Sequence, residues 1–400
     1  MDNSEMNKNK WDFADKDTAT ICEDTRPALT YWADVWYRFK KNKLAILGLI
    51  MTVLIFAAAF LGPMLTSISY SDQVLENANI PPIISVTDIG DGNYVYIHKE
   101  FKVVNVTQNG EVLGSAKKID SDAINRKNTF DVNGKEVVVD YSKATKKNLG
   151  KDELKYELIV DGEKIDNSAI KKVWNKTNFF GTDTSGRDVL VRVLYGGRIS
   201  LAVGVVAAVM NCIVGILYGG IAGYEGGRTD NIMMRCVDFI SSIPLLLIVI
   251  LIGVFVQGSG LFTIILTIGL VYWVDMARLV RGQVMTLKQQ EFVLAERTLG
   301  ASKSRIISKH LIPNALGPIV VSMMMSVPSA IFTESFLSFI GLGVSAPQAS
   351  WGTLASDSLG VIRSFPYQLI IPSISIAVTM FALNFVGDGL RDALDPKQRN

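Results

Sequence analysis

The run Leu44–Leu65, LAILGLIMTVLIFAAAFLGPML, contains 22 residues without a charged side chain. A helix needs about 20 consecutive apolar residues to cross the hydrocarbon core of a bilayer. The whole chain has 400 residues, of which 49% are hydrophobic and 20% are charged, and several such spans explain this composition better than one oversized core does. The run therefore predicts a transmembrane helix within an all-α polytopic membrane protein.

The residues before this run predict a helix at the membrane surface. Four large apolar side chains follow the spacing of one helix face: Trp32, Val35, Trp36 and Phe39. Paired tryptophans are typical of the membrane–water interface, and lysines lead from here into the apolar run. We therefore expect an interfacial amphipathic helix at residues 31–43, preceded by a cytosolic tail at residues 1–30. A helix that packs on a protein partner is the alternative.

The first predicted span, residues 44–65, is followed by a segment of different character at residues 66–178. This segment is polar and rich in lysine, with alternating apolar residues at Tyr94–Ile97 and Val137–Tyr141. Three dipeptides that favour tight hairpin turns lie near such residues: Asn109-Gly110, Asn133-Gly134 and Asp161-Gly162. Because acidic and basic residues nearly cancel here, the segment does not favour an anionic partner. We predict a small β-rich inserted domain.

Five further apolar runs predict the remaining spans: Ile199–Tyr224, Phe239–Val256, Leu261–Ala277, Ile319–Ile340 and Leu369–Val386. Lysine and arginine gather in alternate connections between the runs, and seven of them lie between Arg278 and Lys309. Because basic residues favour the cytoplasmic side, we expect both termini inside the cell and the inserted domain outside it. Residues 179–400 then form a core with five transmembrane helices, which makes six with the first span.

The segment Glu291–Pro313, EFVLAERTLGASKSRIISKHLIP, is charged but lies between two apolar runs. Gly300 stands where a helix beginning near Gln283 needs a residue that tolerates left-handed geometry, and Ser302 follows as a candidate N-cap. An arginine stands three residues after this cap, so no capping box is expected. The final proline is expected to end the second helix. We predict a cytosolic hairpin at residues 283–313 that offers its outer face to a partner; a surface loop that joins two spans is the alternative.

Two carboxylates lie within or beside the predicted spans. Glu334 falls inside the fifth span, and Asp275 lies near the inner end of the fourth. A charged group in a membrane is costly and usually faces a bundle interior or a cavity. We expect Glu334 either to bond to neighbouring backbone or a basic partner or to line a pathway. Asp275 is expected to pair with Arg278, which follows one helical turn later.

Several kinds of active site have no signature in this sequence. It contains neither a phosphate-binding loop of the form G-x-x-x-x-G-K-[ST] nor the zinc-protease motif H-E-x-x-H. The two histidines, His98 and His310, and the three cysteines do not have the spacing of metal ligands. The net charge of +2 gives no indication of a nucleic-acid partner. We therefore expect no catalytic, cofactor or metal site on this chain, and any energy that it uses must come from elsewhere.

Several motifs together resemble those of permeases from oligopeptide and dipeptide ABC importers, of the OppC or DppC type. They extend from Trp32 to the C-terminus except for the inserted domain: RFKKNKLA at 38–45, FFGTDTSGRD at 179–188, YG at 195–196, RIS at 198–200, ARLVRG at 277–282, ESFLSFIGLG at 334–343, SWG at 350–352 and GDGLRDALDP at 387–396. The hairpin, with Gly300 and the ending Ile312-Pro313, is similar to the EAA loop of such permeases. The E-A-A triplet falls on Leu294-Ala295-Glu296, so its first acid is absent and its second alanine is acidic here.

The resemblance implies a permease subunit that works by alternating access in an ATP-driven importer. It would pair with a sister permease, bind two cytosolic ATPases that hold ATP and Mg²⁺, and receive peptide from an extracellular binding lipoprotein. The inserted domain would contact that lipoprotein or act as a passive cap. The coupling hairpin would dock on an ATPase through the following residues: Glu291, Ala295, Glu296, Gly300, Ala301, Ile312 and Pro313.

The resemblance also implies a place in the cell, namely the bacterial plasma membrane, where the multi-pass chain would contact lipid and no nucleic acid. Two other functions stay open from the sequence. One is import of nickel chelates or other small peptide-like solutes by the same mechanism. The other, more remote, is a receptor-like subunit in which the inserted domain senses a ligand and the hairpin signals to a cytosolic partner.

Overall fold

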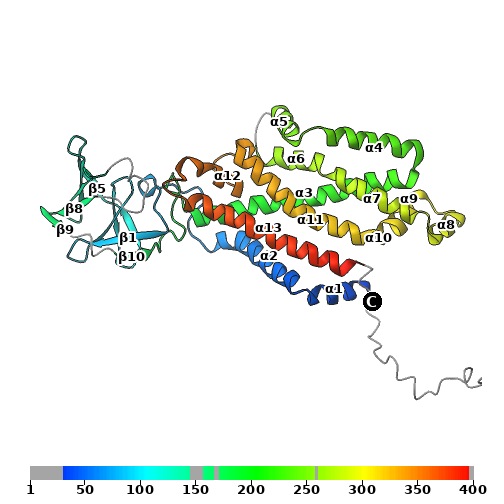
Figure 1. Cartoon of the computed structure of the whole chain (residues 1–400), viewed down its shortest axis with the longest axis horizontal. Helices are drawn as coiled ribbons and strands as arrows, with labels where there is room; N and C mark the ends of the chain where they lie inside the picture. The colour runs from blue at the N-terminus through cyan, green and yellow to red at the C-terminus, as the bar shows by residue number, and fades with distance from the viewer. Residues whose placement is uncertain (1–29, 145–155, 166–170, 257–259, 396–400) are drawn as a thin grey trace, which may run out of the picture.

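The computed structural model describes residues 30–144, 156–165, 171–256 and 260–395, so nearly all of the predicted N-terminal tail lies outside the described residues. A bundle of long helices forms the centre of the molecule (Figure 1). The inserted domain lies at one end of this bundle, and the predicted hairpin lies at the other end. The predicted fold class, a helical membrane protein with a β-rich insert, is confirmed.

Two helices begin the described chain, α1 (Tyr31–Lys41) and α2 (Lys43–Leu61). Asn42 separates them in an extended conformation, and its side chain accepts hydrogen bonds from the backbone N–H groups of Leu44 and Ala45. This N-cap satisfies two of the donors that the first turn of a helix leaves without partners. The first predicted span is therefore present as α2, extended by a short turn, η3 (Gly62–Met64).

The apolar face predicted for α1 is divided in the structure. Val35 and Phe39 are buried in one cluster with residues of α2 and of the last helix, α13 (Tyr367–Leu394). Trp32 and Trp36 are instead 54% and 48% exposed. Two of the four apolar side chains therefore pack α1 against the helical bundle. The two tryptophans remain on the surface, as expected for a helix that lies at a membrane interface.

The described part of the insert forms two five-stranded antiparallel sheets, which we call sheet A and sheet B. Sheet A has the order β10-β1-β2-β3-β4, with β1 (Ile83–Asp88), β2 (Tyr94–Ile97), β3 (Val103–Val106), β4 (Val112–Ser115) and β10 (Lys171–Trp174). Sheet B follows the chain in order, with β5 (Lys117–Asp122), β6 (Lys127–Val132), β7 (Lys135–Asp140), β8 (Glu157–Val160) and β9 (Glu163–Ile165). Val95 of sheet A and Val137 of sheet B belong to one buried cluster, so the two sheets pack face to face.

The three predicted turn dipeptides connect antiparallel strands as expected. Asn133 and Gly134, between β6 and β7, both have positive φ, at +53° and +85°. Asp161 and Gly162, between β8 and β9, also have positive φ, at +49° and +86°. Two left-handed central residues match the twist of a two-residue hairpin, which is why Asn-Gly and Asp-Gly predict it well. Gly110, between β3 and β4, has a φ of +89°.

Among the described residues, five helices are long and apolar enough to cross a membrane, and a bent pair adds a sixth if it counts as one span. The five are α2, α3 (Val189–Glu225), the α6–α7 unit (Leu261–Val271 and Trp273–Leu287), α11 (Leu316–Leu337) with its extension η7 (Ser338–Leu342), and α13. The bent pair consists of α4 (Gly227–Ser242) and α5 (Leu245–Phe255), whose axes differ by 88°. Three of the short helices outside the spans and the hairpin are η4 (Leu75–Asn77), α12 (Trp351–Asp357) and η8 (Leu359–Val361).

The predicted third span, Phe239–Val256, is broken into two helices and is present only if the bent pair counts as one span. The chain breaks between α4 and α5 at Ile243 and Pro244, where Ile243 is extended with φ −86° and ψ +124°. Proline has no N–H to continue the helix, and its ring disfavours helical geometry in the residue before it. The bend therefore follows from one residue within an otherwise apolar run.

The second span begins at Val189 rather than at the predicted Ile199. Asp188 caps it, since its side chain accepts a hydrogen bond from the Val191 N–H at 3.0 Å. The early start places Arg192 and Arg198 inside the helix, where both donate hydrogen bonds to other segments. The predicted span began after these two arginines, because the groups that bond to them lie outside the apolar run and could not be identified from it.

Helix α3 packs unusually closely against α7. Gly215, Gly219 and Gly223 face α7, and a Cβ atom added to any of them would come within 2.8 Å of an atom in that helix. Small residues allow such close approach between membrane helices, where packing rather than the hydrophobic effect holds helices together. The contact joins the centre of the bundle to the segment that leads into the hairpin.

Candidate functional site

The predicted hairpin consists of two short helices that follow α7. They are α8 (Glu291–Thr298) and α9 (Lys303–Ile306), and Gly300 between them has a φ of +79°, as its position predicted. The Ser302 side chain accepts a hydrogen bond from the Arg305 N–H at 3.4 Å, which confirms the predicted N-cap. The predicted start near Gln283 is wrong, because that residue belongs to α7 and the chain becomes extended at Gln290 before α8 begins.

The prediction that Pro313 ends the second helix is confirmed to within one residue, because the last helical residue before the break at Ala315 is Asn314. After α9 the chain forms a π turn, η6 (Ile307–Leu311), then α10 (Ile312–Asn314), and continues almost directly into α11. The Ile312 N–H bonds to the Ile307 carbonyl, five residues back, so the helix is locally widened just before the proline. A widened turn accommodates a residue that has no N–H to donate, and the hairpin is thereby joined rigidly to a membrane span.

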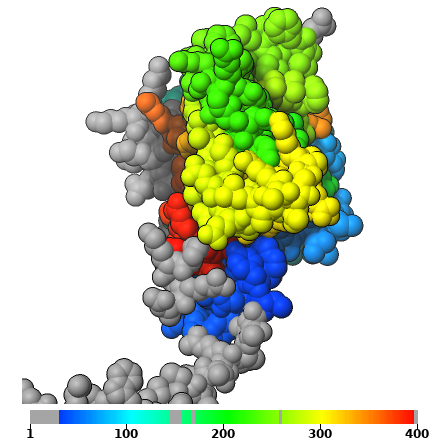
Figure 2. Space-filling view, turned by 90° about the vertical axis from the view of Figure 1, so that its right-hand side faces the viewer, coloured from blue at the N-terminus to red at the C-terminus, as the bar shows by residue number. Residues whose placement is uncertain are grey.

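The inner face of the hairpin is packed against the helical bundle. Val293, Ile306 and Leu311 are almost completely buried in one cluster with Tyr224 of α3 and Val284 of α7. Figure 2 views the molecule from this end, and the hairpin residues, in yellow, form the middle of the face. Since a continuous buried core links the hairpin with α3 and α7, a force on the hairpin is transmitted directly to both helices.

Polar contacts add to this connection at the C-terminal end of α3. Lys288 donates to the Gly223 carbonyl at 2.7 Å, and Lys303 pairs with Glu225 at 2.8 Å. The Arg297 guanidinium lies 5.1 Å from the centre of the Tyr224 ring. Three cations thus meet the helix end whose free carbonyl groups carry partial negative charge, which is a favourable arrangement.

The residues predicted for docking do not share one face. Glu291, Ala295 and Gly300 lie on the exposed outer face. Glu296 is half-buried beside His310, with a carboxylate oxygen 3.3 Å from Nε2. Ala301 and Ile312 are half-buried and pack inward against the cluster of Val293, whereas Pro313 is exposed next to the membrane span.

Three apolar side chains on the outer face were missed by sequence reasoning. Leu299 is 82% exposed at the tip, and Leu294 and Phe292 on α8 are 50% and 40% exposed. Each lies in a charged segment whose buried positions are already filled by other side chains. An apolar tip on a rigid, polar hairpin is typical of a protein contact site. A leucine directly before the turn glycine was the available signal in the sequence.

Glu334 lies in the interior of the bundle and is completely buried. Its carboxylate accepts hydrogen bonds from three serine hydroxyls, those of Ser200 at 2.8 Å, Ser338 at 2.7 Å and Ser335 at 3.4 Å. Ser200 also accepts from the Trp351 N–H at 3.3 Å. The carboxylate therefore connects α3, α11 and α12 through hydroxyl donors rather than through the backbone or basic partners considered from the sequence.

Asp275 lies at the surface, with its side chain 91% exposed. The expected contact with Arg278 exists at 3.7 Å, but Arg278 approaches Asp238 of α4 more closely, at 3.0 Å. Exposed pairs of this kind contribute little to stability. The arginine links α7 to α4 on the side of the bundle that carries the hairpin.

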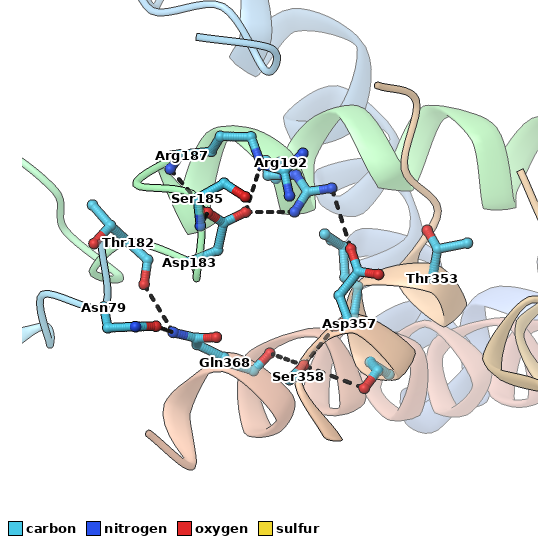
Figure 3. A network of polar contacts seen from close by, with 12 residues as sticks. Asn79, Thr182, Asp183, Ser185, Arg187, Arg192, Thr353, Asp357, Ser358 and Gln368 are labelled. Carbon is cyan, nitrogen blue, oxygen red and sulfur yellow. Dashed lines mark hydrogen bonds and ion pairs between the residues drawn. The ribbon is translucent and has the colours of Figure 1, made fainter. Parts of the chain in front are cut away.

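A second polar site lies at the opposite end of the bundle, in the segment 179–188 that carried part of the family resemblance (Figure 3). Asp183 accepts from Arg187 Nε at 2.7 Å and from Arg192 Nη1 at 2.6 Å, and both arginines are buried. Arg192 Nη2 lies 3.6 Å from Asp357 at the end of α12. Buried charges at this distance compensate one another's loss of hydration. The network fixes the start of α3.

The same region fixes the insert to the bundle. Gln368 of α13 donates to the Asn79 side chain at 2.9 Å and to the Thr182 carbonyl at 3.1 Å. The Tyr367 hydroxyl donates to the Thr182 carbonyl at 2.6 Å and to the Ile80 carbonyl at 3.0 Å. Residues that precede the insert's strands in the chain and residues that follow them therefore both bond to the first turn of α13. The sequence did not reveal these contacts because the bonded residues are far apart in the chain.

His98 forms the other junction between insert and bundle. It is 2% exposed, its Nε2 donates to the Asn79 carbonyl at 3.0 Å, and its Nδ1 accepts from the Glu100 N–H at 3.1 Å. The ring stacks on Phe365, whose centre is 5.5 Å away, and Lys99 donates to the Ser364 carbonyl at 2.8 Å. Both ring nitrogens are thus satisfied when the imidazole is neutral.

We predict that acid weakens this junction. Burial lowers the pKa of His98 below its ordinary value of about 6.5, and nearby Lys99 and Lys102 act in the same direction while Glu100 and the bond to Asn79 oppose them. Because the folded pKa is depressed, the stabilisation is complete above about pH 6.5 and falls by about 1.4 kcal/mol per pH unit below it, until the folded pKa is reached.

The measurement is the melting temperature of the purified protein between pH 8 and pH 5.5. We expect a fall on acidification that is smaller in a His98→Gln variant, which keeps a neutral donor and acceptor. An equal fall in the two proteins would show that other groups cause the acid sensitivity.

Comparisons with known proteins were made on the whole chain. A family model described as "Binding-protein-dependent transport system inner membrane component" matches residues 215–400. A second, described as "N-terminal TM domain of oligopeptide transport permease C", matches residues 30–82. The two matches cover the first span and most of the helical core.

Three curated relatives illustrate the similarity. The oligopeptide transport system permease protein OppC of Bacillus subtilis strain 168 is 39% identical over 392 residues, which is 98% of each chain. The dipeptide transport system permease protein DppC of the same organism is 39% identical over 94% of this chain and 88% of its own. OppC of Escherichia coli K12 is 50% identical over 222 residues, 56% of this chain and 73% of its own. The 392-residue alignment necessarily includes nearly all of the insert.

Proposed function

Because the chain belongs to the family of OppC- and DppC-type permeases of binding-protein-dependent transport systems, we propose that its hairpin is the site at which ATP-driven motion enters the permease. The chain is a permease subunit of an oligopeptide or dipeptide ABC importer and a multi-pass inner-membrane protein. A partner ATPase and a binding protein belong to such a complex, and the ATPase activity is not a property of the permease subunit.

One observation carries the proposal: the hairpin is rigidly packed on its inner side and apolar at its outer tip. Leu299 is 82% exposed, whereas Val293 and Ile306 are buried against α3 and α7. When a groove on a cytosolic ATPase accepts Leu299 and moves, α3 and α7 move with it, because Val293 and Ile306 are buried in one cluster with residues of both helices. The outer face supplies Glu291 and Ala295 around this apolar centre.

The orientation that we propose follows from charge. The hairpin end of the bundle also carries the start of α1 and the end of α13, as Figure 1 shows, and it is the end with the basic connections. Basic residues favour the cytoplasmic side, so both termini and the hairpin face the cytosol. The insert then faces outward and is the part of the chain that a binding protein meets first.

The complete assembly that we propose contains a sister permease, two cytosolic ATPases and an external binding lipoprotein that delivers peptide. We propose that ATP and Mg²⁺ bind to the ATPases, and among the residues that the structure describes no group of His, Cys, Asp and Glu side chains could hold a metal ion. Alternating access follows if ATP binds more tightly to the state in which the hairpins approach each other, because a ligand shifts an equilibrium only by its difference in affinity for the two states. The full-length similarity to peptide permeases favours import over a receptor-like function.

A substitution at the turn tests the coupling. Gly300 has a φ of +79°, and no atom of this chain lies within 4 Å of an added Cβ. Gly300→Asp therefore causes no internal clash, and since aspartate is one of the non-glycine residues that adopt left-handed geometry, its main effect is to add a negative charge to the outer face. We expect a loss of both peptide uptake and substrate-stimulated ATP hydrolysis in proteoliposomes that hold the assembled transporter.

The matched control is Gly300→Asn, because asparagine tolerates left-handed geometry and brings no charge. It should retain most of the activity. Normal uptake and normal stimulated hydrolysis in Gly300→Asp would contradict a coupling role for the hairpin.

A further inference from the structure

Three large apolar side chains lie exposed together on the insert, and we call them the Trp174 patch: Ile83, Trp174 and Phe179. Their exposed fractions are 51%, 44% and 51%. Ile83 and Trp174 are direct partners in the pairing of β1 with β10. The Trp174 ring lies 5.0 Å from the Phe179 ring, and its Nε1 donates to the Phe179 carbonyl at 2.9 Å. The indole is thus held in place, with its polar atom satisfied and its apolar surface outward.

The patch lies at the end of sheet A that meets the membrane helices. The Phe179 ring is 5.4 Å from the ring of Phe180, which packs in one cluster with Ala59 of α2 and Val193 of α3. On the other strand, Ile80 lies just before β1 and accepts a hydrogen bond from Tyr367 at the start of α13. Through Phe180 the patch is therefore connected to α2 and α3, and the segment that leads into β1 is bonded to the start of α13.

The surface beside the patch is apolar on the membrane side. Leu61, Met64 and Leu65, at the end of α2 and just beyond it, are 58%, 77% and 86% exposed. In Figure 1, β1 and β10 lie on the same side of the molecule as α2. Both the end of a membrane span and the insert thus expose large apolar side chains, whereas the surface of a water-facing domain is mostly polar.

Basic side chains accompany the patch. Lys172 precedes Trp174 by two positions on β10 and shares its side of the sheet, because side chains alternate along a strand. Lys176 lies between Trp174 and Phe179 in the chain, and both lysines are exposed. In the part of the chain that the structure describes, neither lysine forms a salt bridge with a carboxylate. Aromatic residues with adjacent lysines have the chemistry of a membrane interface that contains anionic lipid.

We propose that the Trp174 patch inserts into the headgroup region of the leaflet on the insert's side, and that Lys172 and Lys176 bind anionic phospholipid headgroups there. The contact anchors the insert at a second point, in addition to its hydrogen bonds with α13. The insert is thereby held at a fixed angle to the membrane. Its other end, around the β5–β6 turn at Ile124, remains in water.

The test measures the depth of spin labels in the full-length chain within the assembled transporter. Cys22, Cys212 and Cys236 are replaced by serine, and a nitroxide is attached to a single cysteine at position 83 or 179. The sample is reconstituted in vesicles of phosphatidylcholine or of an equimolar mixture with phosphatidylglycerol. Collision rates with oxygen, which is enriched in lipid, and with a water-soluble nickel chelate give the depth of each label.

We expect labels at positions 83 and 179 to collide more often with oxygen than with the nickel chelate, and to move deeper when phosphatidylglycerol is present. The double substitution Lys172→Glu and Lys176→Glu should abolish the dependence on phosphatidylglycerol. Labels at positions 119 and 124 are matched controls, because Ile119 and Ile124 are apolar residues of the insert, on β5 and in the turn that follows it, and are 60% and 93% exposed. These control labels should collide mainly with the nickel chelate.

Two results would overturn the proposal. Labels in the patch that behave like the controls would place it in water. Labels that are shielded from both reagents in both lipid mixtures would show that a protein surface covers the patch. That surface belongs to the sister permease if the shielding is present in the transporter alone, and to the binding protein if the shielding appears only when the binding protein is added.

Discussion

A Gly219→Ala variant is expected to lose most of its folded protein in the membrane, although the substitution adds a single methyl group. The new Cβ would lie 2.3 Å from the Ala277 carbonyl oxygen of α7 and 3.0 Å from the Ala277 Cα. These are backbone atoms of a packed helix and cannot rotate away as a side chain does. We expect destabilisation of about 3 kcal/mol, the upper end of the usual cost of overpacking, with separation of α3 from α7.

The matched control is the neighbouring glycine. A Cβ at Gly220 would meet Ile307 at 3.5 Å and Ile312 at 3.8 Å, which are ordinary contacts. Since alanine is about 1 kcal/mol more favourable than glycine in a helix, Gly220→Ala should be neutral or stabilising. The measurement compares the melting temperature and membrane yield of the two variants. Equal stability of the two would mean that α3 and α7 are not packed as described.

A Leu299→Asp variant is expected to fold normally but to lose transport. Leu299 is 82% exposed, so the substitution removes no contact within this chain. In the docked state it would place a carboxylate in an apolar contact at the centre of the interface, where single substitutions commonly cost 2 kcal/mol or more, or about a 30-fold loss of affinity. Peptide uptake and substrate-stimulated ATP hydrolysis should both fall, while the melting temperature of the isolated permease stays unchanged.

Leu299→Met provides the control for this prediction, because methionine keeps an apolar side chain of similar volume at the tip. It should retain uptake close to that of the original protein. A Leu299→Asp transporter that imports peptide at a normal rate would show that the tip is not buried by a partner.

The membrane spans and the turns were predictable because they depend on local chemistry. Uncharged length predicts α2, and the need for positive φ predicts the turns at Gly134, Gly162 and Gly300. Two prolines differ in how well the sequence revealed their effect. The break at Pro244, inside the predicted third span, was not foreseen, whereas the helix that contains Pro313 ends one residue after it, as predicted to within a residue.

The polar networks could not be predicted because their members are distant in sequence. Ser200 and Glu334 are 134 residues apart, and Asn79 and Gln368 are 289 residues apart. Each side chain by itself has several reasonable partners, and the fold selects one of them. The exposed tip of the hairpin was missed for a different reason: the family resemblance drew attention to Ala295 and Glu296, whereas exposure identifies Leu299.

Photo-cross-linking from position 299 tests the coupling proposal most directly. A photoreactive amino acid replaces Leu299 in the assembled transporter, and a second sample carries it at Ile124, which is equally accessible but lies on the insert at the opposite end of the molecule. The proposal predicts an adduct between position 299 and an ATPase subunit and no ATPase adduct from position 124. Absence of an ATPase adduct from position 299 in an active complex would contradict it.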